Sequence, residues 1–241
     1  MYDALGNHYD ALVDKAYYDR WYDYVAEIIG ERTRGADVGC GSGLFTVELA
    51  RRGKEVMGCD VSPVMLSKAF ERAKRAGVSV RFVETKAEKL ALGRPSEFIT
   101  AMNDVVNYMK EPSPFFKAAA ANLKVGGLLL FDVSSEYKLK ERIASHTFCL
   151  EGENTVCVWE SSPVRGGALK YYLKFFTRTD SGLFRLEEEC QTQYVHTKES
   201  LEEKLEQCGF TVKVFGDMTK KKPKQNALRL HFVAVKGSVN G

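Results

Sequence analysis

The sequence predicts an α/β protein with a doubly wound, Rossmann-like sheet, and two stretches carry this prediction. Residues 36–43 (ADVGCGSG) combine a short apolar strand, an acid and three alternating glycines, and the helical run 44–52 follows. Residues 54–60 then predict a second strand that ends at Asp60. Glycines let the backbone turn from strand to helix and approach a ligand closely. A carboxylate about 20 residues further on is placed to meet ribose hydroxyls, so the pair predicts a nucleoside site.

The order of the glycines separates two kinds of nucleoside site. The pattern is D-x-G-x-G-x-G, whereas a dinucleotide site for NAD carries G-x-G-x-x-G. The leading acid, Asp37, is placed to meet a ligand ammonium group, which NAD lacks. An NAD-linked reductase is therefore the weaker alternative, and Ser42 is expected to cap the helix that follows the glycines.

Composition narrows the class of protein. The chain of 241 residues is long enough for one sizeable α/β domain with an insertion, and its net charge of +3 is too small to indicate nucleic-acid binding. Six scattered cysteines without a C-x-x-C pair, and few histidines, predict reduced thiols in a cytoplasmic protein and no metal site. No signal sequence or membrane-spanning run is expected.

The remaining elements follow in chain order. Residues 2–30 predict two helices rich in tyrosine. A helix over 63–76 has Ser62 as its cap and Pro63 at its first position, and Gly77 ends it. Strands are expected at 78–83, 98–102 and 128–133, the last apolar on both faces as in a buried parallel strand, with a helix at 114–123 between the last two.

The second half of the chain interrupts this alternation. A short helix at 137–143 precedes runs of period two at 155–160, 169–178 and 183–195, and 179–182 is typical of a hairpin turn. These runs predict an inserted antiparallel sheet. A helix at 198–208, capped by Thr197, and strands at 210–215 and 228–235 then return the chain to the core.

These motifs resemble the class I S-adenosylmethionine (SAM)-dependent methyltransferases along almost the whole chain. The resemblance is closest to bacterial small-molecule enzymes, near the glycine and amino-sugar N-methyltransferases, in a branch whose substrates are mostly unassigned. It implies a seven-stranded sheet of order 3-2-1-4-5-7-6 with strand 7 antiparallel. Residues 1–133 and 196–241 would form the SAM-binding core with an N-terminal helical lid (1–30), and 134–195 an inserted antiparallel subdomain that covers the substrate. A dimerisation ribbon is the alternative for the insertion.

The glycine motif and the resemblance together imply a SAM site. Asp37 and Asp60 are expected to meet the ammonium and the ribose, and the lid to contribute aromatic rings. The expected cofactor residues are Tyr9, Tyr17, Trp21, Asp37, Gly39, Cys40, Gly41, Asp60, Val61, Met65, Lys86, Ala87, Asn103 and Asp104. Lys86 departs from the family, which usually has an aspartate there to accept the adenine amino hydrogen.

The methyl acceptor is expected to bind where the fourth strand ends. Asn107 and Tyr108 match the family's Asn-Tyr pair, and together with Arg229 they are the expected substrate residues. Methyl transfer from a sulfonium needs mainly alignment in a dry cavity, so it predicts no compulsory catalytic side chain. If the acceptor must lose a proton, the candidate bases are Asp104, Tyr108, His146 and Tyr194.

The sequence thus predicts a SAM-dependent methyltransferase that moves a methyl group to N or O of a small-molecule acceptor. No nucleic-acid or membrane partner is expected, and the protein would be a monomer or a homodimer. The alternative is a methyltransferase-like protein that binds SAM or its product S-adenosylhomocysteine (SAH) without turnover, and Lys86 is the residue that favours it.

Overall fold

The large sheet follows the predicted doubly wound topology. The computed structural model describes His8 and residues 15–238. In spatial order, the seven strands of this sheet are β10 (Phe210–Gly216), β11 (Arg229–Lys236), β5 (Leu123–Ser134), β4 (Ser96–Ala101), β1 (Arg34–Val38), β2 (Glu55–Asp60) and β3 (Arg81–Glu84). β11 runs in the opposite direction to the other six strands. It pairs with β5 on one side and with β10 on the other. The predicted strand order and the antiparallel seventh strand are confirmed.

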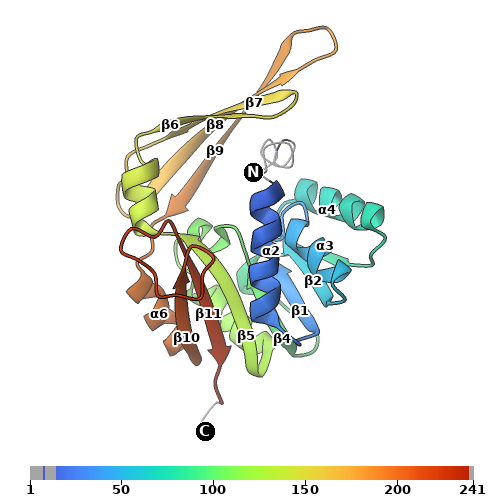
Figure 1. The fold of residues 1–241 in the computed structure, drawn as a ribbon, viewed down its shortest axis with the longest axis vertical. Coiled ribbons are helices and arrows are strands. Elements are labelled where there is room, and N and C mark those ends of the chain that lie inside the picture. Colours follow the sequence, from blue (N-terminus) through green and yellow to red (C-terminus); the bar gives the residue numbers. More distant parts are fainter. Residues whose placement is uncertain (1–7, 9–14, 239–241) are drawn as a thin grey trace.

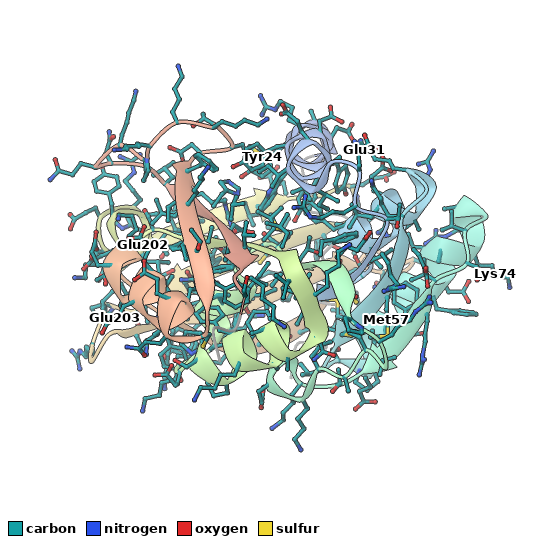
Figure 2. All side chains as sticks on the ribbon, turned by 90° about the horizontal axis from the view of Figure 1, so that it is seen from below. Tyr24, Glu31, Met57, Lys74, Glu202 and Glu203 are labelled. Atoms are coloured by element: carbon teal, nitrogen blue, oxygen red, sulfur yellow. The ribbon has the colours of Figure 1, made fainter. Side chains whose placement is uncertain are left out.

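Helices cover both faces of this sheet. On one face α2 (Lys15–Ile29) and α3 (Leu44–Arg51) pack on side chains such as Phe98 and Leu130, with α4 (Pro63–Ala76) beside α3. On the other face α5 (Ser113–Asn122) and α6 (Lys198–Gln207) pack on the alternate residues, such as Ile99 and Phe131. Figure 2 shows Tyr24 of α2 and Glu202 of α6 on opposite sides of the sheet. Both faces of the central strands are therefore buried, as their apolar sequences predict.

Local signals place most helix ends correctly. The Ser62 hydroxyl accepts a hydrogen bond from the Met65 N–H at 3.3 Å, and Gly77 ends α4 in the left-handed conformation. At α6, the Thr197 hydroxyl accepts from the Ser200 N–H at 3.2 Å. The expectation that Ser42 caps α3 is wrong, because the capping position is Gly43, with φ of 80° and no side-chain cap.

The insertion forms a separate four-stranded antiparallel sheet. Its strands, in order, are β6 (Thr147–Glu151), β7 (Thr155–Ser161), β8 (Ala168–Arg178) and β9 (Phe184–Tyr194). The sequence predicted the last three but not the short, exposed β6. A π-helical turn, η4 (Lys138–Ile143), connects β5 to this sheet and buries Leu139 and Ile143 against it. In Figure 1 the sheet stands above the end of the core at which α2 begins.

The amino-terminal part of the chain reaches the inserted sheet. The His8 imidazole is buried, with Nε2 at 2.7 Å from Glu187 Oε2 and its ring stacked on Phe175 at 5.0 Å. The predicted first helix and Tyr9 lie outside the described residues. In the described part of the chain, no helix is both long and apolar enough to cross a membrane.

Candidate active site

A cavity of about 340 Å³ lies where β1, β2 and β4 end. Ligands of doubly wound folds bind at this edge, outside the carboxyl ends of the strands. The predicted site residues that line it are Asp37, Gly39, Cys40, Gly41, Asp60, Val61, Met65, Lys86, Ala87, Asn103 and Tyr108. The sequence did not single out several others, among them Tyr18, Thr85, Glu88, Met102, Val105 and Met109. Two short 3₁₀ turns, η2 (Ala87–Lys89) and η3 (Val105–Tyr108), contribute to the wall.

The glycine turn between β1 and α3 makes room for a ligand. Gly39 and Gly41 both have positive φ, of 67° and 53°. A Cβ at Gly39 would lie 2.5 Å from a Val105 methyl, so Gly39 is needed for packing. At Gly41 the nearest side-chain atom to an added Cβ is Met65 Sδ at 4.0 Å. A side chain at Gly41 would therefore project into the cavity, and the open cradle fits a ligand that lies against the main chain.

The turn is tied to the end of β2 through Asp60. One carboxylate oxygen accepts the Gly41 N–H at 2.9 Å, and the other accepts the Ser62 N–H at 2.9 Å. Burial raises the pKa of Asp60, and these backbone hydrogen bonds act in the opposite direction. An ionised carboxylate offers about four lone pairs, and the N–H groups of Gly41, Val61 and Ser62 use three of them, so one remains for a ligand hydroxyl.

Asp37, at the end of β1, is almost fully buried. Its carboxylate oxygens accept hydrogen bonds from the Thr46 hydroxyl at 2.6 Å and the Thr100 hydroxyl at 2.8 Å. Burial raises the pKa of Asp37 to about 6, although both hydroxyls favour the charged form. A ligand cation would lower this pKa again, because none of the described residues supplies a cationic partner to Asp37.

A strained turn carries Asn103 into the cavity. Asn103 and Asp104 are consecutive non-glycine residues with φ of 68° and 66°. Their N–H groups donate to the two oxygens of buried Asp132, at 2.6 and 3.2 Å. The Arg229 guanidinium pairs with Asp104, at 2.8 Å between Nη1 and Oδ1, and also with Asp132. Buried charged groups thus stabilise this turn, although non-glycine residues disfavour the positive φ that it requires.

The comparisons with known proteins agree with this geometry. A family model described as a methyltransferase domain matches residues 36–127. A protein of Geobacillus sp. (strain WCH70), which carries the name "putative methyltransferase", is 31% identical over 98% of this chain and 99% of its own length. The chain belongs to the class I SAM-dependent methyltransferases.

Solved structures match this methyltransferase along almost its whole length. A SAM-dependent methyltransferase from Clostridium acetobutylicum has a TM-score of 0.85 at 24% identity, covering 98% of this chain and 96% of its own. The sugar N-methyltransferase KedS8 from Streptoalloteichus has a TM-score of 0.74 at 20% identity, with 99% and 93% covered. A ubiquinone biosynthesis O-methyltransferase of Paraburkholderia phymatum is 29% identical over 57% of this chain and 56% of its own length. At these identities the solved structures show a shared fold.

The cofactor is SAM, and the donor set of the cavity suits its parts. Asp60 would hold the ribose hydroxyls, because its oxygens face the open cradle at Gly41. Asp37 would meet the ammonium of the methionyl group. Gly41 leaves room for the ligand to lie against the main chain. When bound, SAM supplies a methyl group on a positively charged sulfur.

The chain departs from its family in the part of the cavity that is expected to bind adenine. Lys86 lines the cavity but its side chain is exposed, and its carbonyl accepts the Lys89 N–H at 2.9 Å. Two further hydrogen-bond acceptors lie on the same wall, the Thr85 hydroxyl and the Glu88 carboxylate. The apolar side is formed by Met65 and Val61. An adenine amino group therefore has acceptors within this wall even without an aspartate at position 86.

The predicted aromatic lid is arranged differently from the expectation. Trp21 is fully buried and lies over Arg229, with its ring centroid 4.8 Å from the guanidinium carbon, while Tyr17 hydrogen-bonds Arg229. Neither side chain lines the cavity, whereas Tyr18, one position along α2, does. The helical period explains the difference, because adjacent positions on a helix point about 100° apart.

The other predicted residues are not among the described residues that line the cavity; they are Asp104, Asn107, His146, Tyr194 and Arg229. The Asn107 amide donates to the carbonyls of Ser134 and Tyr194, at 3.4 and 3.0 Å. His146 is exposed, with Nδ1 at 2.8 Å from the carbonyl oxygen of Ala144. Arg229 is paired with Asp104 and Asp132, so an acidic substrate group would have to compete with two carboxylates. The substrate and catalytic assignments of these residues stay predictions.

Proposed function

We propose that this enzyme transfers the SAM methyl group to nitrogen or oxygen of a small-molecule acceptor held between the cavity and the inserted sheet. The observation that carries the proposal is the contact between η3 and β9. The Tyr108 hydroxyl, at the cavity wall, donates to Gln191 Oε1 at 2.8 Å, and the Asn107 amide donates to the Tyr194 carbonyl. These contacts join the inserted sheet to η3, which forms part of the cavity wall, and they support a role of the sheet in holding the acceptor.

The arrangement supports catalysis by alignment and exclusion of water. The cradle at Gly41 and the carboxylate of Asp60 would fix the cofactor, while η3 and β9 would position the acceptor in line with the methyl and the sulfur. Displacement at a sulfonium uses up its positive charge, so a dry cavity favours the transfer. We propose accordingly that residues 1–133 and 196–241 form the SAM-binding core with lid 1–30, and that 134–195 covers the substrate.

A small acceptor also suits the charge of the chain. The net charge is +3, and the basic run at 220–224 lies in a single connection between β10 and β11. Binding driven by phosphates needs several aligned cations, so no nucleic-acid partner is proposed. All six cysteines are free thiols, which supports a protein of the reducing cytoplasm.

A protein that binds SAM or SAH without turnover is the second candidate, favoured by the exposed Lys86 at the adenine end. Calorimetry with SAM, SAH and NAD, followed by SAH release in the presence of acceptors, separates the candidates. Micromolar SAM binding with turnover supports the enzyme, and binding without turnover of any acceptor supports the second candidate. Preference for NAD over SAM would contradict both.

A further inference from the structure

The inserted sheet has an open edge at β6. This strand pairs with β7 on one side, and no described strand pairs with it on the other. All of its residues are exposed except Phe148, which is partly buried. Edge strands are commonly protected against further pairing by lysine, proline or a bulge. β6 contains neither lysine nor proline, and its register with β7 is continuous, so its open edge is available to another strand.

The ladder with β7 determines which backbone groups point to this edge. His146 and Gly152 flank β6, and both bond to β7. The His146 carbonyl accepts the Ser161 N–H at 2.9 Å, and the Gly152 N–H donates to the Thr155 carbonyl at 2.8 Å. In an antiparallel ladder each residue directs both of its backbone groups to the same neighbouring strand, and successive residues alternate. The even-numbered positions of β6 therefore face β7, and the odd-numbered positions direct N–H and C=O groups to the open edge.

These outward groups are complementary to those of a second copy of β6. The odd-numbered positions are Thr147, Cys149 and Glu151, with Cys149 at the centre of the strand. An antiparallel pairing centred on Cys149 has a two-fold axis, and it places the two Cys149 residues opposite each other and Thr147 opposite Glu151. The outward groups then exchange about six hydrogen bonds across the axis. Glu151 meets a threonine, so no like charges lie directly opposite each other.

The apolar side chains of β6 support the same register. Phe148 lies on the sheet face that η4 covers, with its ring centroid 5.1 Å from that of Trp159. Leu150 lies on the same face, opposite Cys157, and is 40% exposed. Pairing about Cys149 places Phe148 opposite Leu150 of the second copy, at a position without hydrogen bonds, where side chains approach most closely. The apolar row of one sheet then continues into the other sheet and covers Leu150.

We propose that β6 is a homodimer interface, at which two copies join their inserted sheets edge to edge into one continuous antiparallel sheet. The contact is isologous, so it closes at two copies and does not extend into a fibre. A different protein would have to supply a strand of matching length with apolar residues at the same positions, whereas a second copy supplies it by symmetry. The proposal goes beyond the proposed function and does not depend on methyl transfer.

Cross-linking of the native thiols tests the register. Cys149 and Cys190 are both exposed, and they lie on β6 and β9, at opposite edges of the inserted sheet. In the paired sheets the two Cys149 Cα atoms would be about 5.5 Å apart. The two Cys190 residues would be separated by about seven strand spacings, roughly 34 Å. A short bismaleimide should therefore join two chains of the wild type and of Cys190→Ser, but not of Cys149→Ser. A cross-link that survives in Cys149→Ser, or no cross-link in the wild type, overturns the proposal.

A proline at the centre of β6 tests the hydrogen bonds. Cys149→Pro removes an N–H that points to the open edge and that the ladder with β7 does not use, a change that edge strands tolerate. In sedimentation equilibrium the wild type should be a dimer, and the mass of Cys149→Pro should be half as large. Cys149→Ala keeps the N–H, so this control should remain dimeric. A monomeric wild type at every protein concentration, or a dimeric Cys149→Pro, overturns the proposal. If Cys149→Pro does not fold, the cross-linking result decides.

Discussion

The affinity for SAM should fall as the pH is lowered from 7 to 5, because Asp37 must be ionised to pair with the cofactor ammonium. Burial raises the pKa of Asp37 to about 6 in the free protein. With that pKa, about nine-tenths of the carboxyl is ionised at pH 7 and about one-tenth at pH 5. The SAM dissociation constant should therefore rise about tenfold over this range.

Titration of Asp37 does not itself weaken the fold over this pH range. A buried acid whose pKa is raised above its unfolded value binds protons more tightly when folded, so Asp37 adds stability as the pH falls through 6. Its contribution grows until the pH reaches the unfolded pKa near 3.9. The free protein at pH 5 is thus not destabilised through this group.

Calorimetry at pH 5, 6 and 7 measures the effect, and two comparisons isolate it. 5′-Methylthioadenosine lacks the amino-acid part of SAM, so its binding reports the ribose and adenine contacts alone, including titration of Asp60. Asp37→Asn keeps the side-chain shape and can still bond to Thr46 and Thr100. This variant should bind SAM more weakly at pH 7 and lose the Asp37 part of the pH dependence. Equal SAM affinity of the wild type at pH 5 and pH 7 would refute the pairing.

Three substitutions in the cofactor cavity have defined expectations, each measured by calorimetry with SAM. Asp60→Ala should weaken binding by about 1.5–3 kcal/mol, the range for hydrogen bonds to a charged acceptor, and unchanged affinity in a folded variant excludes a ribose contact. Gly41→Val should abolish binding, since its side chain would fill the cradle, and retained affinity would contradict that placement. Lys86→Asp should tighten binding by about 1–2 kcal/mol if the adenine amino group lacks an acceptor. Equal or weaker binding would mean that Thr85, Glu88 or a backbone carbonyl already accepts.

Patterns that depend on neighbouring residues were predicted well. The glycine turn, the Ser62 and Thr197 caps and the alternating strands each depend on residues a few positions apart, and the structure contains all of them. The exception is Ser42, where the left-handed conformation of Gly43 ends the turn one residue later than expected. Short, exposed β6 was missed because its pairing with β7, rather than an apolar alternation, defines it.

Contacts between distant segments set the parts of the site that the sequence did not reveal. The α2 pattern predicts an apolar stripe, but not that Tyr18 faces the cavity while Trp21 lies over Arg229. Gln191 reaches Tyr108 across 83 positions in the sequence, and Arg229 reaches Asp104 across 125. No local pattern marks such partners, because a glutamine or an aspartate acquires its role only from the element packed against it.

The buried cluster behind Asn103 leads to a last prediction, which concerns folding energy. Each Asp132 oxygen accepts an N–H of the strained turn, and one of them also accepts from Arg229. In Asp132→Asn the amide NH₂ would face one of these donors, so the variant should lose about 2–4 kcal/mol of unfolding free energy in urea. The same loss would follow from the broken charge pair alone, so this variant cannot show that Asp132 holds the turn.

A double-mutant cycle with Asn103→Gly separates the two effects. Glycine adopts positive φ without strain, so Asn103→Gly should stabilise the wild type by about 0.5–1 kcal/mol. If Asp132 holds Asn103 in its strained conformation, the turn relaxes in Asp132→Asn and glycine then relieves no strain. The gain from Asn103→Gly should accordingly disappear in that background. An equal gain in both backgrounds would show that the turn keeps its conformation without Asp132, and that the carboxylate serves only to neutralise Arg229.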